Sequence, residues 1–483
     1  MASFDPQMAR KDYLERLFVR YSTLTLPLDI AGHMFPLQAI FQPMMLHRDP
    51  FTVRKQGSET ITEIIRARDG AEALAKSAAG RMIVLGGPGM GKTTALKALF
   101  CRAITAAQVD SLAPLPLFVS LPELARMELS LEEYIVQLLT DLDIDLQFLE
   151  VLKEAIQGGH AFLCLDSLDE VLPALRPDVI AFLNRKAPSC QGVWIIGSRF
   201  TEYKGGQFAH SQFAEWELQP LNEQERLALA RQLLPALYDV FYAYTTLSER
   251  PARPSEEAYI NALEQSTRMA SWAENPLLLS LAAIPYVETG RLPASRALLY
   301  AQVMDAIFAM RIPDAEQRVK LRFLLAEIAL EFYQTRGRNF TTTDVLECLS
   351  RLVPDQQVQP LYTTLALILD SGVLEPVAYQ TYGFKHQMFQ EYLAAVALAR
   401  RCVDEARSQE AWDLLWRKRR FSRWSEILRL LTGVLVLEHG AQGVQMAHSW
   451  LSALAQECST ADGDPGHLCL ILAMKSLHES GDA

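Results

Sequence analysis

One stretch decides the fold of this chain: Met82-Ile83-Val84-Leu85-Gly86-Gly87-Pro88-Gly89-Met90-Gly91-Lys92-Thr93-Thr94. Its apolar start, residues 82–85, predicts a buried strand, and the residues that follow Thr93 predict a helix. The segment between them has the spacing G-x-x-x-x-G-K-[ST], which in this strand–loop–helix context is typical of a phosphate-binding loop. Glycines let backbone N–H groups turn inward around phosphate oxygens at positions where a Cβ would clash.

Two residues at the end of this stretch add specific chemistry. Lys92 can reach the β- and γ-phosphates of a nucleotide, and the Thr93 hydroxyl can ligate Mg²⁺. The following helix points its partly positive N-terminus at the same phosphates. The alternative is a glycine-rich turn with an exposed lysine, which leaves the flanking strand and helix unexplained. We therefore predict a site for a nucleoside triphosphate and Mg²⁺, with ATP against GTP left open, whose phosphate-binding residues are Gly86, Gly87, Pro88, Gly89, Met90, Gly91, Lys92, Thr93 and Thr94.

Composition limits the class of protein. The chain has 483 residues, half of them apolar, 21% charged, and a net charge of −11. These values predict two to four domains with sizeable cores and argue against non-specific DNA binding over the whole surface. Seven cysteines without a C-x-x-C pair indicate a reducing compartment rather than a zinc site or a disulfide framework. Because no signal peptide or membrane-length apolar run is present, we expect a cytoplasmic protein with no membrane partner.

Five short apolar runs alternate with helical stretches between residues 81 and 221. This alternation predicts a parallel sheet with helices on both faces, and ligands in such folds bind at the carboxyl ends of the strands. From Asn222 onward the pattern is almost wholly helical, with Asn222 and Ser255 as expected N-caps. A β-rich stretch near residues 373–384 is the exception, with Gly372 and Gly383 as expected turn residues. The five expected strands are Met82–Leu85, Leu115–Leu121, Ala161–Leu165, Val193–Gly197 and Trp216–Leu218.

Acidic residues follow the third expected strand. Asp166 stands at the carboxyl end of that strand, where its carboxylate can hold Mg²⁺ beside Thr93. Asp169 and Glu170 follow on the turn and can orient or deprotonate an attacking water; which of the two is the base stays open. The alternative is a solvated acidic loop, but three carboxylates in five residues repel one another unless a cation lies among them.

The remaining motifs are less specific. The fourth strand ends in Ser198-Arg199, and the Arg199 guanidinium suits γ-phosphate oxygens, although a surface arginine at a strand end is the alternative. Asn275-Pro276 is fully explained as a helix start, with the asparagine as cap. His386 at another helix start is, on residue type alone, more often structural than functional.

Taken together, these motifs resemble the NACHT family of signal-transduction NTPases, a STAND-type group of P-loop proteins that includes NOD-like receptors and their bacterial relatives. The likeness runs in order from about residue 80 to 435, and its most family-specific feature is the pair Asp169-Glu170. The resemblance implies a P-loop NTPase core followed by a helical domain, a winged helix and a C-terminal helical segment. The implied segments are 1–79 (helical lead-in), 80–221 (NACHT domain), 222–290 (helical domain), 291–400 (winged helix) and 401–483 (helical segment).

The resemblance also assigns roles to residues. It implies catalytic roles for Asp169, Glu170 and Arg199, with Arg199 as a sensor of the γ-phosphate. It places Pro276 near the adenine, and it makes His386 a contact to the β-phosphate of bound ADP. In this family ADP holds the protein closed, exchange for ATP allows homo-oligomerisation, and slow NTP hydrolysis resets the switch. The activating signal, the effector partner and the oligomer stoichiometry stay open, and bacterial antiphage defence is the expected setting.

Two other functions share parts of this sequence pattern. An AAA-like remodeller would use the same phosphate loop and acidic pair, with an arginine finger supplied by a neighbouring subunit. A winged-helix regulator of nucleic acids would use the cluster Arg417-Lys418-Arg419-Arg420 with Arg423. A solvated helix face and linker is the better explanation of that cluster, so we expect no nucleic-acid partner.

Overall fold

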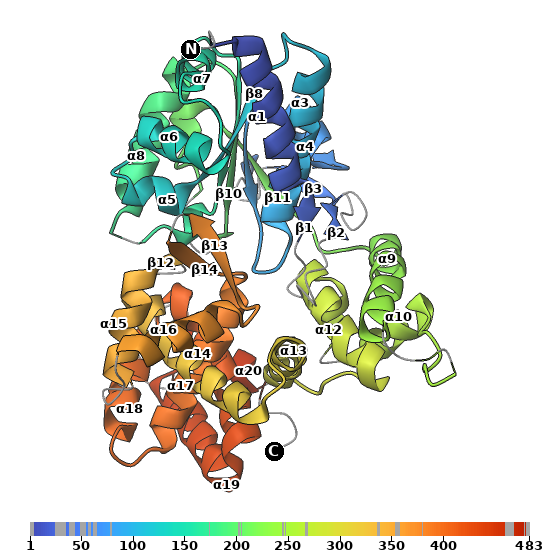
Figure 1. The fold of residues 1–483 in the computed structure, drawn as a ribbon. Helices are drawn as coiled ribbons and strands as arrows, with labels where there is room; N and C mark the ends of the chain where they lie inside the picture. The colour runs from blue at the N-terminus through green and yellow to red at the C-terminus, as the bar shows by residue number, and fades with distance from the viewer. Residues whose placement is uncertain are drawn as a thin grey trace. The chain divides into compact units, whose positions relative to one another are not determined.

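The chain forms two compact units, which are described separately (Figure 1). Unit 1 comprises Met1–Thr25, Met34–Leu233 and Ser271–Ser280, and unit 2 comprises Leu26–His33, Leu234–Ala270 and Leu281–Ala483. Parts of the expected lead-in lie outside the described residues, and the five expected segments stay a prediction. The computed structural model describes residues 4–24, 35–37, 44–48, 55–56, 59–60, 65–77, 80–172, 174–200, 203, 205–243, 246, 248–265, 269–335, 339–352, 358–378, 380–458, 468–477 and 479.

A seven-stranded sheet is the centre of unit 1, with the strand order β6-β3-β11-β7-β10-β9-β8. The pairs from β11 to β8 are parallel, and β3 and β6 are antiparallel at one edge. All residues of β7 and β9 are buried, as expected of strands covered on both faces. The five expected strands are confirmed. The strands are β3 (Leu46–Arg48), β6 (Arg66–Ala67), β7 (Arg81–Leu85), β8 (Leu115–Ser120), β9 (Ala161–Asp166), β10 (Val193–Ser198) and β11 (Ala214–Leu218).

Helices flank this sheet (Figure 1). The helix after the phosphate loop, α4 (Lys92–Val109), packs against β8, β9 and β10. The amphipathic lead-in helix α1 (Pro6–Tyr21) packs on α4, and the Tyr13 hydroxyl donates to the Pro116 carbonyl at 2.8 Å. The other helices of the unit are α3 (Gly70–Ala75), α5 (Leu121–Arg126), α6 (Leu131–Asp141), α7 (Phe148–Gln157) and α8 (Arg176–Ser189); short strand pairs are β1 (Thr23–Leu24) with β2 (Phe35–Pro36) and β4 (Lys55–Gln56) with β5 (Glu59–Thr60).

Two helices run from unit 1 into unit 2 along the chain, α9 (Glu223–Phe241) and α12 (Pro276–Thr289). The predicted capping box of α9 is confirmed: Glu225 N donates to Asn222 Oδ1 at 3.0 Å, and Asn222 N donates to Glu225 Oε2 at 2.8 Å. Ser255 caps α10 (Glu256–Glu264) as expected, because its Oγ accepts from Ala258 N at 3.1 Å. A one-turn helix, α11 (Ala270–Ala273), precedes α12.

Unit 2 contains a three-stranded antiparallel sheet among helices, with the order β12-β14-β13. The expectation that Gly383 is a turn residue is wrong, because it lies inside β14 and pairs with Asn339 and Glu375. Gln380 instead lies between the two hairpin strands, with a positive φ of 51°. The elements are α13 (Arg296–Arg311), α14 (Ala315–Thr335), β12 (Asn339–Thr341), α15 (Thr342–Leu352), α16 (Val358–Leu369), β13 (Leu374–Ala378), β14 (Thr381–Phe384) and α17 (Gln387–Val403).

The core of unit 2 is helical: α17 packs against α14 and α19, and α19 packs against α20. The expected core face of α17 is confirmed, since Phe389, Leu393 and Val396 are fully buried. The long helix α19 (Ser425–Cys458) leaves helical geometry at Gly440 (φ 52°, ψ −135°), so it consists of two halves. The other two helices are α18 (Ser408–Lys418) and α20 (Leu468–Leu477). No helix in the described part of the chain combines the length and apolarity needed to span a bilayer.

Candidate nucleotide-binding site

The phosphate loop joins β7 to α4 inside unit 1. Gly89 and Gly91 have positive φ angles of 73° and 80°, which glycine adopts without steric cost. Lys92 Nζ donates to the carbonyls of Gly86 and Gly87, each at 3.0 Å, so the ammonium lies against the start of the loop. Burial lowers the pKa of Lys92, and the nearby carboxylate of Asp169 opposes that shift. The predicted phosphate-binding residues therefore form one continuous loop with the lysine folded onto it.

Asp166 ends β9, and its carboxylate is held beside Thr93, as predicted. The side chain of Thr93 forms a hydrogen bond with the carboxylate, and Asp166 is only 7% exposed. Burial raises the pKa of Asp166, and the hydrogen bond from Thr93 opposes the shift. On the neighbouring strand, a Cβ at Gly197 would lie 2.7 Å from Asp166 Oδ1, so only glycine leaves room for this carboxylate.

The donor set suits Mg²⁺, which prefers hard oxygen ligands and usually retains waters and substrate phosphates in its shell. Thr93 and Asp166 supply one hydroxyl and one carboxylate. Among the residues that the structure describes, no group of three or more His, Cys, Asp and Glu side chains has a metal-binding arrangement. The pair therefore fits a metal shared with a nucleotide, rather than a cage made by the protein alone.

The acidic turn after β9 and the end of β10 meet through an ion pair. Arg199 Nε lies 2.9 Å from Asp169 Oδ2, and Arg199 N donates to Asp169 Oδ1 at 3.1 Å. The two side chains are 17% and 6% exposed, respectively. Both carboxylate oxygens of Asp169 are thus engaged by one residue. Ser167 has a left-handed φ of 65°, and the short 3₁₀ helix Leu168–Glu170 that follows it carries both acidic residues.

The start of α12 lies against the tip of the phosphate loop. Pro276 is the first residue of this helix, as expected. The contacts with the loop come from its neighbours: Asn275 Nδ2 donates to the Pro88 carbonyl at 2.9 Å, and Leu277 N donates to the Gly89 carbonyl at 3.3 Å. Sequence reasoning missed Asn275 as a loop contact, because its role as a helix cap already explains the residue type.

His386 belongs to unit 2, so its expected contact with a phosphate in unit 1 stays a prediction. It precedes α17 at the N-cap position, with an extended backbone (φ −135°, ψ 136°). Its ring lies 6.0 Å from that of Phe389 in an edge-on arrangement. Within unit 1, the structure brings together the loop, Asp166, the Asp169–Glu170 turn, Arg199 and the residues on either side of Pro276.

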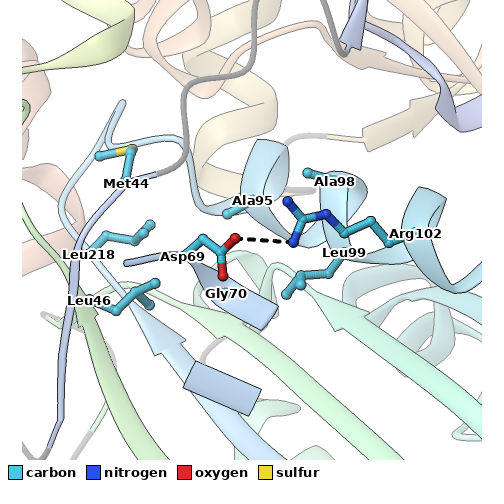
Figure 2. A pocket seen from close by; sticks show the side chains of 9 residues that line it. All are labelled: Met44, Leu46, Asp69, Gly70, Ala95, Ala98, Leu99, Arg102 and Leu218. Atoms are coloured by element: carbon cyan, nitrogen blue, oxygen red, sulfur yellow. Dashed lines mark hydrogen bonds and ion pairs between the residues drawn. The ribbon is translucent and has the colours of Figure 1, made fainter. Parts of the chain in front are cut away.

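A small hollow lies beside the loop, under the first turns of α4 (Figure 2). The ion pair between Arg102 Nη1 and Asp69 Oδ2, 3.1 Å apart, crosses it. Its volume of about 10 Å³ has room for one water molecule, so it does not hold a nucleobase. Its lining residues are Met44, Leu46, Asp69, Gly70, Ala95, Ala98, Leu99, Arg102 and Leu218.

A parallel sheet, a glycine loop between β7 and α4, and an aspartate at the end of β9 define a P-loop NTPase core. Residues 80–236 match the family model of the NACHT domain. The match covers the phosphate loop, the acidic turn and the Arg199 strand.

Other comparisons add little. No curated protein matches the chain. Similar solved structures include the Walker-type ATPase PABY2304 of Pyrococcus abyssi (12% identity, 67% of this chain and 93% of that chain, TM-score 0.28). They also include the Aeropyrum pernix Orc1 protein in complex with DNA (17%, 65% and 86%, TM-score 0.30) and Hsp104 with ATPγS and casein (16%, 62% and 48%, TM-score 0.31). At these TM-scores the likenesses carry no argument about this chain.

Proposed function

We propose that this protein is a nucleotide-gated switch of the NACHT (STAND) class, which rests with ADP bound and forms homo-oligomers when ATP replaces it. The observation that carries the proposal is the meeting of Lys92, Thr93 and Asp166 at one end of the sheet, with α12 on the loop. A nucleotide shifts such a protein only through different affinities for its two states. The groups that can distinguish ATP from ADP are therefore central to the account.

Each residue of the nucleotide site has its own proposed role. The loop N–H groups and Lys92 bind the phosphates, while Thr93 and Asp166 hold Mg²⁺, which when bound neutralises phosphate charge. Arg199 can exchange its contact with Asp169 for the γ-phosphate, which only ATP carries. Asp169 is the resting partner of Arg199, and we assign the general base to Glu170, with Asp169 as the alternative.

The second unit supplies the proposed latch. From α14 to β14 the elements run helix, strand, helix, helix, strand, strand, which is the order of a winged helix and supports that assignment. His386 follows the last of these strands and begins the next helix. We propose that it contacts the β-phosphate of ADP and is released on exchange. A cytoplasmic location, an effector partner and a role in bacterial antiphage defence extend the proposal on the family resemblance alone.

An AAA-like remodeller is the second candidate that the nucleotide site permits. In such an enzyme an arginine from a neighbouring subunit completes the site, and turnover is about one per second or faster. We place the remodeller second because residues 80–236 match the NACHT domain, and we expect hydrolysis well below that rate.

The nucleotide that co-purifies with the protein tests the proposal. We expect ADP in near-equal molar amount on release by denaturation and separation by ion-exchange chromatography, and none from the Lys92→Ala variant. ATP turnover without a trigger should be slow in a coupled-enzyme assay. Steady turnover at about one per second or faster would favour the remodeller. Protein that is free of nucleotide and binds none when it is added would remove the function altogether.

A further inference from the structure

The tip of the phosphate loop is fixed from outside by the start of α12. Two consecutive loop carbonyls, those of Pro88 and Gly89, accept hydrogen bonds from the Asn275 side chain and from Leu277 N, at 2.9 and 3.3 Å. The packing is close, because a Cβ at Gly89 would lie 2.8 Å from Asn275 Oδ1 and 3.0 Å from Leu277 Cβ. These contacts lie within unit 1 and join residues that are 187 positions apart.

Asn275 uses both ends of its amide. Its Oδ1 accepts from Leu277 N and Leu278 N, each at 3.1 Å, and so caps α12. Its Nδ2 is the group that donates to the loop. Serine and aspartate also cap helices well, but serine is too short for this bridge and aspartate has no donor. Asparagine is thus suited to serving the helix and the loop together.

The bridge, meaning the hydrogen bonds from Asn275 and Leu277 to the carbonyls of Pro88 and Gly89, sets the direction in which the loop N–H groups point. In a trans peptide the C=O and the following N–H point in opposite directions. With the carbonyls of Pro88 and Gly89 turned toward α12, the N–H groups of Gly89 and Met90 face away from it. Met90 N is used within the loop, where it donates to the Gly87 carbonyl at 3.4 Å, so the Pro88–Gly89 peptide is the one that Asn275 orients toward a ligand. Inward N–H groups are what a phosphate-binding loop requires.

We propose that Asn275 is a positioning residue of the nucleotide site: it holds the Pro88–Gly89 peptide in the orientation that presents the loop to phosphate. This inference rests on the proposed nucleotide binding and adds a residue outside the phosphate-loop motif. Pre-organisation of this kind raises affinity by lowering the cost of ordering the loop. Since the loop tip would contact phosphates common to both nucleotides, the bridge acts on ADP and ATP alike.

The first measurement is the affinity of Asn275→Ser for ADP and for a non-hydrolysable ATP analogue, by isothermal titration calorimetry on the full chain. Both affinities should fall by about three- to tenfold, the usual worth of one hydrogen bond, and by the same factor. The matched control is Asn222→Ser, which changes the other asparagine cap of unit 1 at the start of α9. That control should bind both nucleotides like the wild type.

A second variant guards against a folding artefact. Asn275→Asp keeps the size and the Oδ1 acceptor of both cap hydrogen bonds but removes the donor, so it should keep the wild-type circular dichroism spectrum and bind nucleotide at least as weakly as Asn275→Ser. Hydrogen exchange gives a readout independent of affinity: ADP should slow exchange at Leu277 and Leu278 in the wild type, and less so in either variant.

Three outcomes would overturn the assignment. They are unchanged affinity in both Asn275 variants, an equal loss in Asn222→Ser, and a loss confined to the ATP analogue, which would make Asn275 a reader of the γ-phosphate. The proposed nucleotide site fails separately, if Lys92→Ala binds nucleotide normally. A failed bridge and a failed site are therefore distinguishable.

Discussion

The fold treats two clusters of like charge in the described residues differently. The acidic cluster at the end of β9 has three carboxylates in unit 1, Asp166, Asp169 and Glu170, and cations that interact with it include Lys92 and Arg199. A divalent cation bound with a nucleotide would add positive charge beside these carboxylates. The arginine cluster, which consists of Arg417, Lys418, Arg419, Arg420 and Arg423 at the end of α18 and just beyond it, lies in unit 2.

The arginine cluster is matched by the protein itself. Arg419 Nη2 and Arg420 Nη2 lie 2.5 and 2.6 Å from Glu457 Oε1. The Arg419 guanidinium also lies 4.1 Å from the ring centroid of Trp416, and that of Arg423 lies 4.6 Å from that of Tyr333. These contacts hold Arg419, Arg420 and Arg423 within unit 2, whereas the acidic cluster lies beside the phosphate loop. That the arginine cluster binds no nucleic acid stays a prediction.

Removal of Lys92, a cation beside the acidic cluster, has the largest expected effect. Lys92→Ala should weaken ADP binding by about a hundredfold or more, because charge-assisted hydrogen bonds to phosphate are lost. Fluorescence anisotropy with a labelled nucleotide measures this, with circular dichroism to confirm folding. Near-normal binding would mean that the loop does not hold phosphate.

The two neighbouring acids sharpen the comparison. Glu170→Gln should slow hydrolysis by about a hundredfold or more with nucleotide affinity kept, as expected for loss of a general base. Asp169→Asn should keep more of the hydrolysis rate and, like Arg199→Ala, alter the ratio of ATP to ADP affinity. Single-turnover assays and calorimetry separate the two effects. If Asp169→Asn stops hydrolysis while Glu170→Gln does not, the base is Asp169.

In the arginine cluster, Glu457→Gln should lower the free energy of unfolding by about 1–2 kcal/mol at pH 7. Hydrogen bonds from Arg419 hold the pKa of Glu457 at about 2, below the ordinary 4.5. Because the folded-state pKa is lowered, this stabilisation is present above about pH 4.5 and is lost as the pH falls toward 2. Urea unfolding of wild type and variant at pH 7 and pH 3 should therefore show a smaller difference at pH 3.

That cluster has an equally direct counter-test. Salt-sensitive DNA binding by the wild type that disappears in Arg419→Glu and Arg420→Glu would contradict the structural reading of the arginines.

The smallest expected effect concerns the backbone of the acidic turn. Ser167 adopts a left-handed conformation that costs a non-glycine residue about 1 kcal/mol. Glycine removes this strain but also makes the unfolded chain more flexible, which offsets part of the gain. Ser167→Gly should therefore raise the free energy of unfolding of unit 1 by about 0.5 kcal/mol. Thermal melting measures this. A lower melting temperature would contradict this prediction. It would mean that the Ser167 side chain stabilises the fold by more than the left-handed backbone destabilises it.

The sequence predicts local features of this protein well. Strands β7 and β9 are largely apolar runs, β11 alternates apolar residues with glutamates, and the phosphate loop is a contiguous motif, so these features follow from neighbouring residues. Strands β3 and β6 were missed because they have three and two residues and include His47, Arg48 and Arg66. They belong to the sheet through long-range pairing, because β3 pairs with β11 and β6 pairs with β3.

The site's long-range contacts are harder to predict. The Arg199–Asp169 pair joins residues 30 positions apart, and Asn275 reaches the loop across 187. In each case a simpler local explanation, a strand end or a helix cap, already accounts for the residue type. Gly383 failed for the same reason, since glycine suggests a turn although this one lies within a strand.

The central claim is that exchange of ADP for ATP changes the state of the whole protein. Size-exclusion chromatography with light scattering tests it most directly, on protein loaded with ADP or with a non-hydrolysable ATP analogue, and with Lys92→Ala as the unresponsive control. The account predicts a single small species with ADP and larger assemblies with the analogue. Identical masses and elution volumes in the two nucleotides would contradict it.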